Sequence, residues 1–161
     1  MSRTYGRTYE GSIDGRGRRV AIAASRFNRL VTDPLVAGAV EELRRHGVAA
    51  DQVDLAWVPG AFELPLVAER LAASGRYAAV VAIGAVVRGA TPHFDHVAGQ
   101  AAAGLAAVTR ATGVPVAFGV LTCDTMEQAL DRAGGKAGNK GAEAALTALE
   151  MAGLLEAIDK D

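Results

Sequence analysis

The chain has 161 residues, half of them hydrophobic, and a formal net charge of −1, which suits one domain with a sizeable core. No basic stripe or basic amphipathic segment indicates a nucleic-acid or membrane-surface partner, and no apolar run is long enough to span a bilayer. One cysteine excludes an internal disulfide, and the N-terminus has no apolar signal-peptide core, so we expect a cytoplasmic protein.

Residues 1–18 are polar and glycine-rich, and we expect them to form an arm before a single domain at 19–161. Short apolar runs rich in valine and isoleucine follow at 18–25, 53–58, 77–87 and 114–122. Their continuous apolarity is typical of strands covered on both faces. Helical patterns alternate with them and then end the chain, at 33–47, 62–75, 96–113, 125–135 and 141–158.

This order, β-α-β-α-β-α-β-α-α, predicts the fold. It is typical of an α/β domain of three layers, with a four-stranded parallel sheet flanked by helices and joined by right-handed crossovers. Ligands of such sheets bind at the carboxyl ends of the strands. The candidate functional residues are therefore those at 25–28, 57–63, 85–93 and 118–125.

The third strand end has the features of an anion site. Gly89, Ala90 and Thr91 can direct free backbone N–H groups toward one point, and Pro92 suits the first position of a helix that Thr91 caps. Unpaired amides and the positive end of the helix dipole attract anions there. Many capped helices bind nothing, however, and both common nucleotide-binding glycine patterns are absent.

Two histidines follow this helix start. His93 lies in the first turn, where its imidazole can accept and donate a proton, although a lone histidine is more often a solvent-facing residue. His96 together with Asp95 has two of the groups that a metal site needs. No third ligand lies at a telling spacing, so we predict no metal.

Other strand ends carry aromatic residues and charges. Phe27 can stack on a planar ring or cover the core, and Phe118, inside the fourth strand, is expected to be packed. Glu63 follows Phe62 and can bind polyol hydroxyls or serve as a first-turn acid of a helix. The glycine-rich segment 131–141 contains three cations that suit phosphate or simply face solvent in a flexible loop: Arg132, Lys136 and Lys140.

Five segments, taken together and in this order, resemble the lumazine synthase (6,7-dimethyl-8-ribityllumazine synthase) family. They are RFN at 26–28, WVPGAFELP at 57–65, GAVVRGATPHFDHV at 84–97, TGVPVAFGVLT at 112–122 and RAGGKAGNKG at 132–141. The resemblance implies a flavodoxin-like fold and the penultimate step of riboflavin biosynthesis. In that step 5-amino-6-(D-ribitylamino)uracil condenses with 3,4-dihydroxy-2-butanone 4-phosphate, losing phosphate and two waters, without a metal or organic cofactor.

The resemblance also implies roles for individual residues. The ring of the uracil substrate stacks on Phe27, and phosphate binds at residues 89–91 and Arg132. His93 transfers protons, and Arg88 has a supporting role. The remaining expected contacts of the uracil substrate are with Asn28, Ala61, Phe62, Glu63, Ala85, Val86, Val87, Phe118 and Lys140.

Assembly is part of the same expectation. Family members form pentamers or shells of sixty subunits, with each site between neighbouring subunits and the arm at 1–18 added to a neighbour. The turn GGKAGN at 134–139 has no insertion, which favours the shell, and riboflavin synthase is an expected partner. A non-catalytic lumazine- or flavin-binding relative and a purely shell-forming one are the alternatives. Because His93 and Arg132 are both present, we favour the enzyme.

Overall fold

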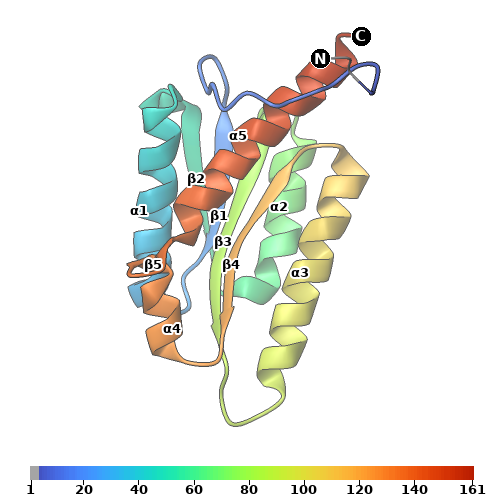
Figure 1. Ribbon diagram of the computed structural model, residues 1–161. Helices are drawn as coiled ribbons and strands as arrows, with labels where there is room; N and C mark the ends of the chain where they lie inside the picture. Colours follow the sequence, from blue (N-terminus) through green and yellow to red (C-terminus); the bar gives the residue numbers. More distant parts are fainter. Residues whose placement is uncertain (1–3) are drawn as a thin grey trace.

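A four-stranded sheet forms the middle layer of the computed structural model, which describes residues 4–161 (Figure 1). All of its strand pairs are parallel and their order is β2-β1-β3-β4. The strands are β1 (Val20–Ser25), β2 (Val53–Val58), β3 (Ala79–Val87) and β4 (Val116–Cys123). The α/β fold with a parallel sheet is therefore confirmed.

Helices cover both faces of this sheet (Figure 1). One face packs against α1 (Arg29–Arg45) and α5 (Lys140–Asp159), and the other against α2 (Leu64–Ala73) and α3 (His93–Thr112). Shorter elements are α4 (Met126–Asp131) and the 3-10 turns η1 (Ala50–Gln52) and η2 (Ala61–Glu63). No helix within residues 4–161 is both long and apolar enough to cross a membrane.

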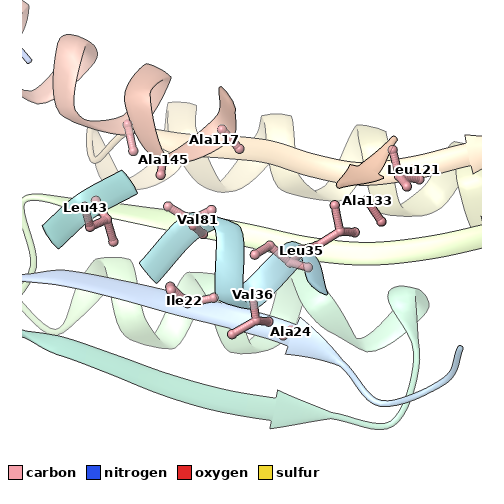
Figure 2. Packing of buried hydrophobic residues seen from close by; sticks show 14 of the residues in the cluster. Ile22, Ala24, Leu35, Val36, Leu43, Val81, Ala117, Leu121, Ala133 and Ala145 are labelled. Carbon is pink, nitrogen blue, oxygen red and sulfur yellow. The ribbon is translucent and has the colours of Figure 1, made fainter. Parts of the chain in front are cut away.

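The two faces hold separate hydrophobic clusters. Along β1, Ile22 and Ala24 face α1, whereas Ala21 and Ala23 face α2 and α3. Figure 2 shows the first cluster, in which Ile22 and Val81 of the sheet lie close to side chains of α1 and α5. Burial on both sides explains why the two central strands, β1 and β3, read as continuous apolar runs.

Helices α1 and α5 pack at very close range. Gly141 of α5 lies so near the carbonyl group of Leu35 in α1 that a β-carbon would overlap the backbone there. We therefore expect Gly141→Ala to lower the free energy of unfolding by about 1–3 kcal/mol. The melting temperature at fixed protein concentration measures this.

The control for that substitution is Gly99→Ala in α3, where no atom lies within 4 Å of an added β-carbon. Alanine at an open helical position stabilises by about 0.5–1 kcal/mol, because it restricts the unfolded chain. We therefore expect the free energy of unfolding to fall in Gly141→Ala and to rise in Gly99→Ala. A Gly141→Ala protein as stable as the wild type would show that α1 and α5 can separate without cost.

Three boundaries differ from the sequence prediction. Helix α1 begins at Arg29 rather than near residue 33 and contains Pro34, because Asn28 adopts a left-handed conformation that turns the chain straight from β1 into the helix. Helix α3 begins at His93, with Pro92 at the N-cap. The segment predicted as an interhelix loop forms an antiparallel hairpin of β5 (Ala133–Gly135) and β6 (Gly138–Asn139).

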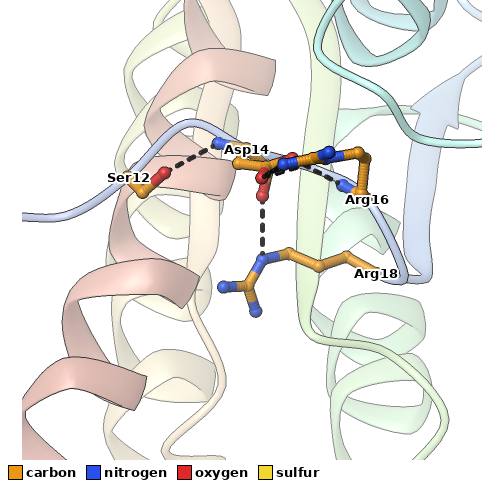
Figure 3. Close-up of polar contacts among 4 residues, drawn as sticks. All are labelled: Ser12, Asp14, Arg16 and Arg18. Carbon is orange, nitrogen blue, oxygen red and sulfur yellow. Dashed lines mark hydrogen bonds and ion pairs between the residues drawn. The ribbon is translucent and has the colours of Figure 1, made fainter.

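The described part of the arm, residues 4–18, has no helix or strand. The Arg16 side chain hydrogen-bonds to Asp14 and lowers its pKa to about 2, and Arg18 donates to the Asp14 carbonyl (Figure 3). Arg18 also pairs with Glu156 of α5 at 2.9 Å. The arm thus lies along α5 of its own chain. Residues 1–3 lie outside the described residues, and addition of the arm to a neighbour stays a prediction.

Candidate functional site

A cleft of about 700 Å³ opens at the carboxyl ends of β1, β2 and β3, where the sequence predicted a site. Its lining comes from three segments that are far apart along the chain, at 27–28, 59–63 and 85–97. Besides Pro59, Gly60, Phe94, His96 and Val97, the lining includes the predicted Phe27, Asn28, Ala61, Phe62, Glu63, Ala85, Val86, Val87, Gly89, Thr91 and His93. The fold therefore brings most of the predicted site residues together.

Phe27 stands out from the surface at the cleft. The backbone N–H groups of Arg26 and Phe27 donate to the carbonyls of Val58 and Pro59 at 2.8 and 3.0 Å. These bonds hold the chain beside the end of β2 and leave the Phe27 ring 70% exposed. The interpretation of Phe27 as a cover over the core is thus wrong. An aromatic face held in this way is available to stack on a planar ligand.

Asn28 joins two strand ends. Its φ of 64° and ψ of 48° are left-handed, a conformation that asparagine tolerates better than most residues. Its carbonyl accepts from Val31 and Thr32 at the start of α1, and its side-chain amide donates to the Ala85 carbonyl at 3.3 Å. The residue therefore fixes the ends of β1 and β3 relative to each other along one wall of the cleft.

The turn η2 supplies a carboxylate. Glu63 occupies the N-cap position of α2 but makes no side-chain capping bond, and its Oε2 lies over Gly60, 3.2 Å from where a β-carbon would stand. Within residues 4–161 no hydrogen bond or ion pair engages this carboxylate, which is exposed in the cleft. At this position the carboxylate interacts favourably with the positive end of the α2 dipole. It can also accept hydrogen bonds from the hydroxyl groups of a ligand.

The turn after β3 presents free amides. Within the described chain, no hydrogen bond uses the backbone N–H of Gly89, Ala90 or Thr91. The Thr91 hydroxyl accepts from the His93 N–H at 3.4 Å, close to the predicted cap. Gly89 and Thr91 line the cleft, whereas Ala90 is exposed beside it. This arrangement at the start of the 20-residue helix α3 suits an anion.

Two imidazoles share the cleft. His93 and His96 both lie in the first turn of α3, and both rings are exposed. In the sequence, His96 is a candidate only as a metal ligand. Its three-residue spacing from His93 indicates, however, that both side chains lie on the same side of the helix and can line one cleft. Among residues 4–161, no group of three or more histidine, cysteine, aspartate or glutamate side chains is arranged to hold a metal.

A second hollow, of about 510 Å³, lies beside β4. It is lined by Arg88, Phe94, Ala98, Ala102, Phe118, Thr122, Cys123, Asp124, Gln128 and Arg132. Phe118 is 41% exposed there, so its predicted packing in the core is wrong. The reason is that β4 is an edge strand, which no further strand covers.

Two predicted cations lie away from the cleft. Arg132 lines the second hollow, where its Nη1 donates to the Gln128 carbonyl at 3.0 Å, and no carboxylate of the described chain lies within 4 Å of it. Lys140 begins α5, is exposed, and lines neither cavity. One chain thus divides the predicted residues between two surfaces.

Arg88, by contrast, pairs with two carboxylates. Its Nε donates to Asp124 at 2.8 Å and its Nη1 to Asp95 at 3.4 Å. The hydrogen bond to Asp124 is the main cause that raises the pKa of Arg88 above its ordinary value. This geometry agrees with a supporting role rather than with a free phosphate ligand.

Comparison with known families gives one match that covers most of the chain. The model of the family described as 6,7-dimethyl-8-ribityllumazine synthase matches residues 17–156. That span contains both cavities, all four strands of the main sheet and every predicted site residue. Family membership implies a transferase that takes part in lumazine synthesis on the route to riboflavin. The chain belongs to the 6,7-dimethyl-8-ribityllumazine synthase family.

Proposed function

We propose that the protein condenses 5-amino-6-(D-ribitylamino)uracil with 3,4-dihydroxy-2-butanone 4-phosphate to 6,7-dimethyl-8-ribityllumazine, releasing phosphate and two waters. The observation that carries the proposal is the composition of the cleft. It combines an exposed aromatic ring, a free carboxylate, a histidine and a helix start with free amides. Each of these groups has a partner in one of the two substrates.

The uracil substrate fits the part of the cleft at β1 and β2. Its flat ring stacks on Phe27, and its ribityl hydroxyls bind the Glu63 carboxylate and Asn28. The pyrimidine edge meets the main chain at 85–87, at the end of β3. Because these groups stand on strand ends and on a short turn fixed by the sheet, the ring would be held in one orientation.

The phosphate substrate fits the other end. Its dianion binds the free amides at 89–91, and a planar guanidinium such as Arg132 adds charge-assisted hydrogen bonds. Arg132, Lys140 and Phe118 lie outside the cleft of their own chain. We propose that they complete the cleft of a neighbouring subunit, so that each site contains residues from two chains.

The reaction moves protons at every stage. The uracil amine attacks the ketone and one water leaves as the imine forms; the phosphate group is then eliminated, and ring closure releases the second water. His93 lies beside the anion-binding turn, where its imidazole can take a proton from carbon as phosphate departs and return one later. Holding both reactants together supplies much of the remaining rate.

His93→Ala is expected to lower kcat on the order of a hundredfold while leaving the KM for the uracil substrate nearly unchanged. Residual activity remains, because positioning does not depend on the imidazole. The matched control is His96→Ala, which removes the other imidazole of the same helical turn. If His93→Ala retains the wild-type kcat, or if His96→Ala is the more damaging change, the proton-transfer role is wrongly assigned.

The assay that tests the whole proposal is phosphate release with both substrates present. We expect release at a rate that saturates with each substrate and none above background with either one alone. A flavin- or lumazine-binding relative would bind the uracil compound tightly and release no phosphate. Tight binding without phosphate release would therefore refute the enzymatic function and favour a lumazine- or flavin-binding function.

We further propose that the subunits form pentamers that build a sixty-subunit shell, with riboflavin synthase as a partner and the cytoplasm as the location. The hairpin at 133–139 turns tightly between α4 and α5, which supports the shell over the isolated pentamer. Light scattering at near-neutral pH and low salt measures the mass. A single species of pentamer mass would exclude the shell.

A further inference from the structure

Arg88 connects three separate elements through one side chain. Its backbone N–H donates to the Cys123 carbonyl at 2.9 Å, which continues the pairing of β3 with β4. Its guanidinium reaches Asp124 after β4 and Asp95 in the first turn of α3, and lies 4.2 Å from the centre of the Phe94 ring. No other arginine within residues 4–161 pairs with two carboxylates from different elements.

The Phe94 ring that Arg88 contacts lines both cavities. The turn that follows Arg88 presents the free amides of 89–91 to the first cleft. Arg88 itself, Asp124 and Arg132 line the second hollow. Arg88 therefore stands between two half-sites: the amides that bind phosphate in the cleft of its own chain, and the cation that we propose completes the cleft of a neighbouring subunit.

The two carboxylates would work against phosphate if they were not neutralised. Asp95 and Asp124 are 64% and 68% exposed; Asp95 lies in the first turn of α3, and Asp124 lies between β4 and α4 and lines the hollow that contains Arg132. A carboxylate near a dianion repels it, and Asp124 is also a competing partner for Arg132 in the same hollow. By holding both acids, Arg88 removes the repulsion and leaves the Arg132 fork free.

We infer that Arg88 is a positioning residue for the phosphate substrate, which acts through Asp124 and Asp95 rather than by touching phosphate. Its ion pairs fix the turn at 89–91 in its own cleft and keep Arg132 available to the dianion in the cleft of the neighbouring subunit. The inference rests on the proposed function for the identity of the substrate. Its test uses inorganic phosphate as well, so that the two ideas can fail separately.

The test compares Arg88→Ala with the double variant Arg88→Ala/Asp124→Asn. We expect the single variant to weaken binding of inorganic phosphate, measured by isothermal titration calorimetry, on the order of tenfold. The KM for the phosphate substrate should rise in parallel, and the KM for the uracil substrate should stay within about twofold. Removing the Asp124 charge in the double variant should restore most of the phosphate affinity.

A matched control separates local pairing from net charge. Arg88→Ala/Glu127→Gln removes one acid from α4 that does not contact Arg88, so it should bind phosphate as weakly as Arg88→Ala. Arg88→Lys keeps the charge but cannot bridge two acids with a planar fork, so it should fall between the wild type and Arg88→Ala.

Three results would overturn the inference. If the double variant with Asp124→Asn binds phosphate no better than Arg88→Ala, Arg88 contacts phosphate directly. Equal weakening of both substrates with a lowered melting temperature would mean a purely structural role. A wild-type protein that does not bind inorganic phosphate would exclude the anion site itself. Failure of the two-substrate assay, with the phosphate series as expected, would instead refute only the proposed reaction.

Discussion

Arg132→Ala is expected to raise the KM for the butanone phosphate by about a hundredfold and to leave the KM for the uracil substrate within about twofold. The guanidinium is exposed, lines the hollow beside β4, and has no carboxylate partner in the described chain. Charge-assisted hydrogen bonds to phosphate are stabilising by about 1.5–3 kcal/mol each, which accounts for the size of the effect. Steady-state kinetics with one substrate saturating measures both constants.

Phe27→Ala provides the opposite pattern in the same assay. Loss of the stacking face should weaken the uracil substrate by about tenfold and leave the phosphate substrate almost unchanged. If Arg132→Ala weakens both substrates equally, or if only Arg88→Ala affects phosphate, the wrong arginine has been assigned. A Phe27→Ala protein that loses affinity only for the butanone phosphate would contradict stacking.

The fold could be predicted from the sequence because the strands and helices repeat one simple rule. The run at 79–87 lies in the middle of a sheet covered on both faces, so it carries no polar residue, whereas the half-buried edge strand at 53–58 contains Asp54. Alternation with helices then fixes a parallel sheet and places the site at the carboxyl ends of the strands. Phe27, Glu63 and His93 meet in one cleft for this reason, although they are far apart in the sequence.

Backbone geometry limited what the sequence could predict locally. Nothing in RFNR indicates that Asn28 takes a left-handed conformation, so the sequence alone places the start of α1 too late, near residue 33. The hairpin at 133–139 has strands of three and two residues, too short for any alternation of polar and apolar side chains. Its glycines indicate a flexible loop equally well.

Contacts between elements far apart in the chain also limited what could be predicted from the sequence. Whether Phe118 is covered depends on β4 being the edge of the sheet, which the order of elements along the chain does not state. One partner of Arg88 is Asp124, 36 residues away, and only the pairing of β3 with β4 brings these two residues together. The separation of Arg132 from the cleft is visible only in three dimensions.

That separation leads to the sharpest expectation about assembly. If the cleft of one subunit is completed by Arg132 and Lys140 of the next, two variants damaged on different surfaces can repair each other. The first, Phe27→Ala/His93→Ala, lacks the stacking ring and the imidazole of the cleft but keeps Arg132 and Lys140. The second, Arg132→Ala/Lys140→Ala, lacks both cationic side chains but keeps Phe27 and His93 in the cleft. Each variant alone should be almost inactive, since every one of its sites lacks one half.

Co-expression of the two variants in equal amounts should restore about one quarter of the wild-type activity. In a cyclic ring each interface takes its cleft from one subunit and its cations from the neighbour, and both halves are intact with a probability of about one half times one half. Two different affinity tags isolate the mixed oligomers, and phosphate release measures their activity. If mixed oligomers are as inactive as the parent variants, each site lies within a single chain, and an active wild-type monomer at high dilution would establish the same.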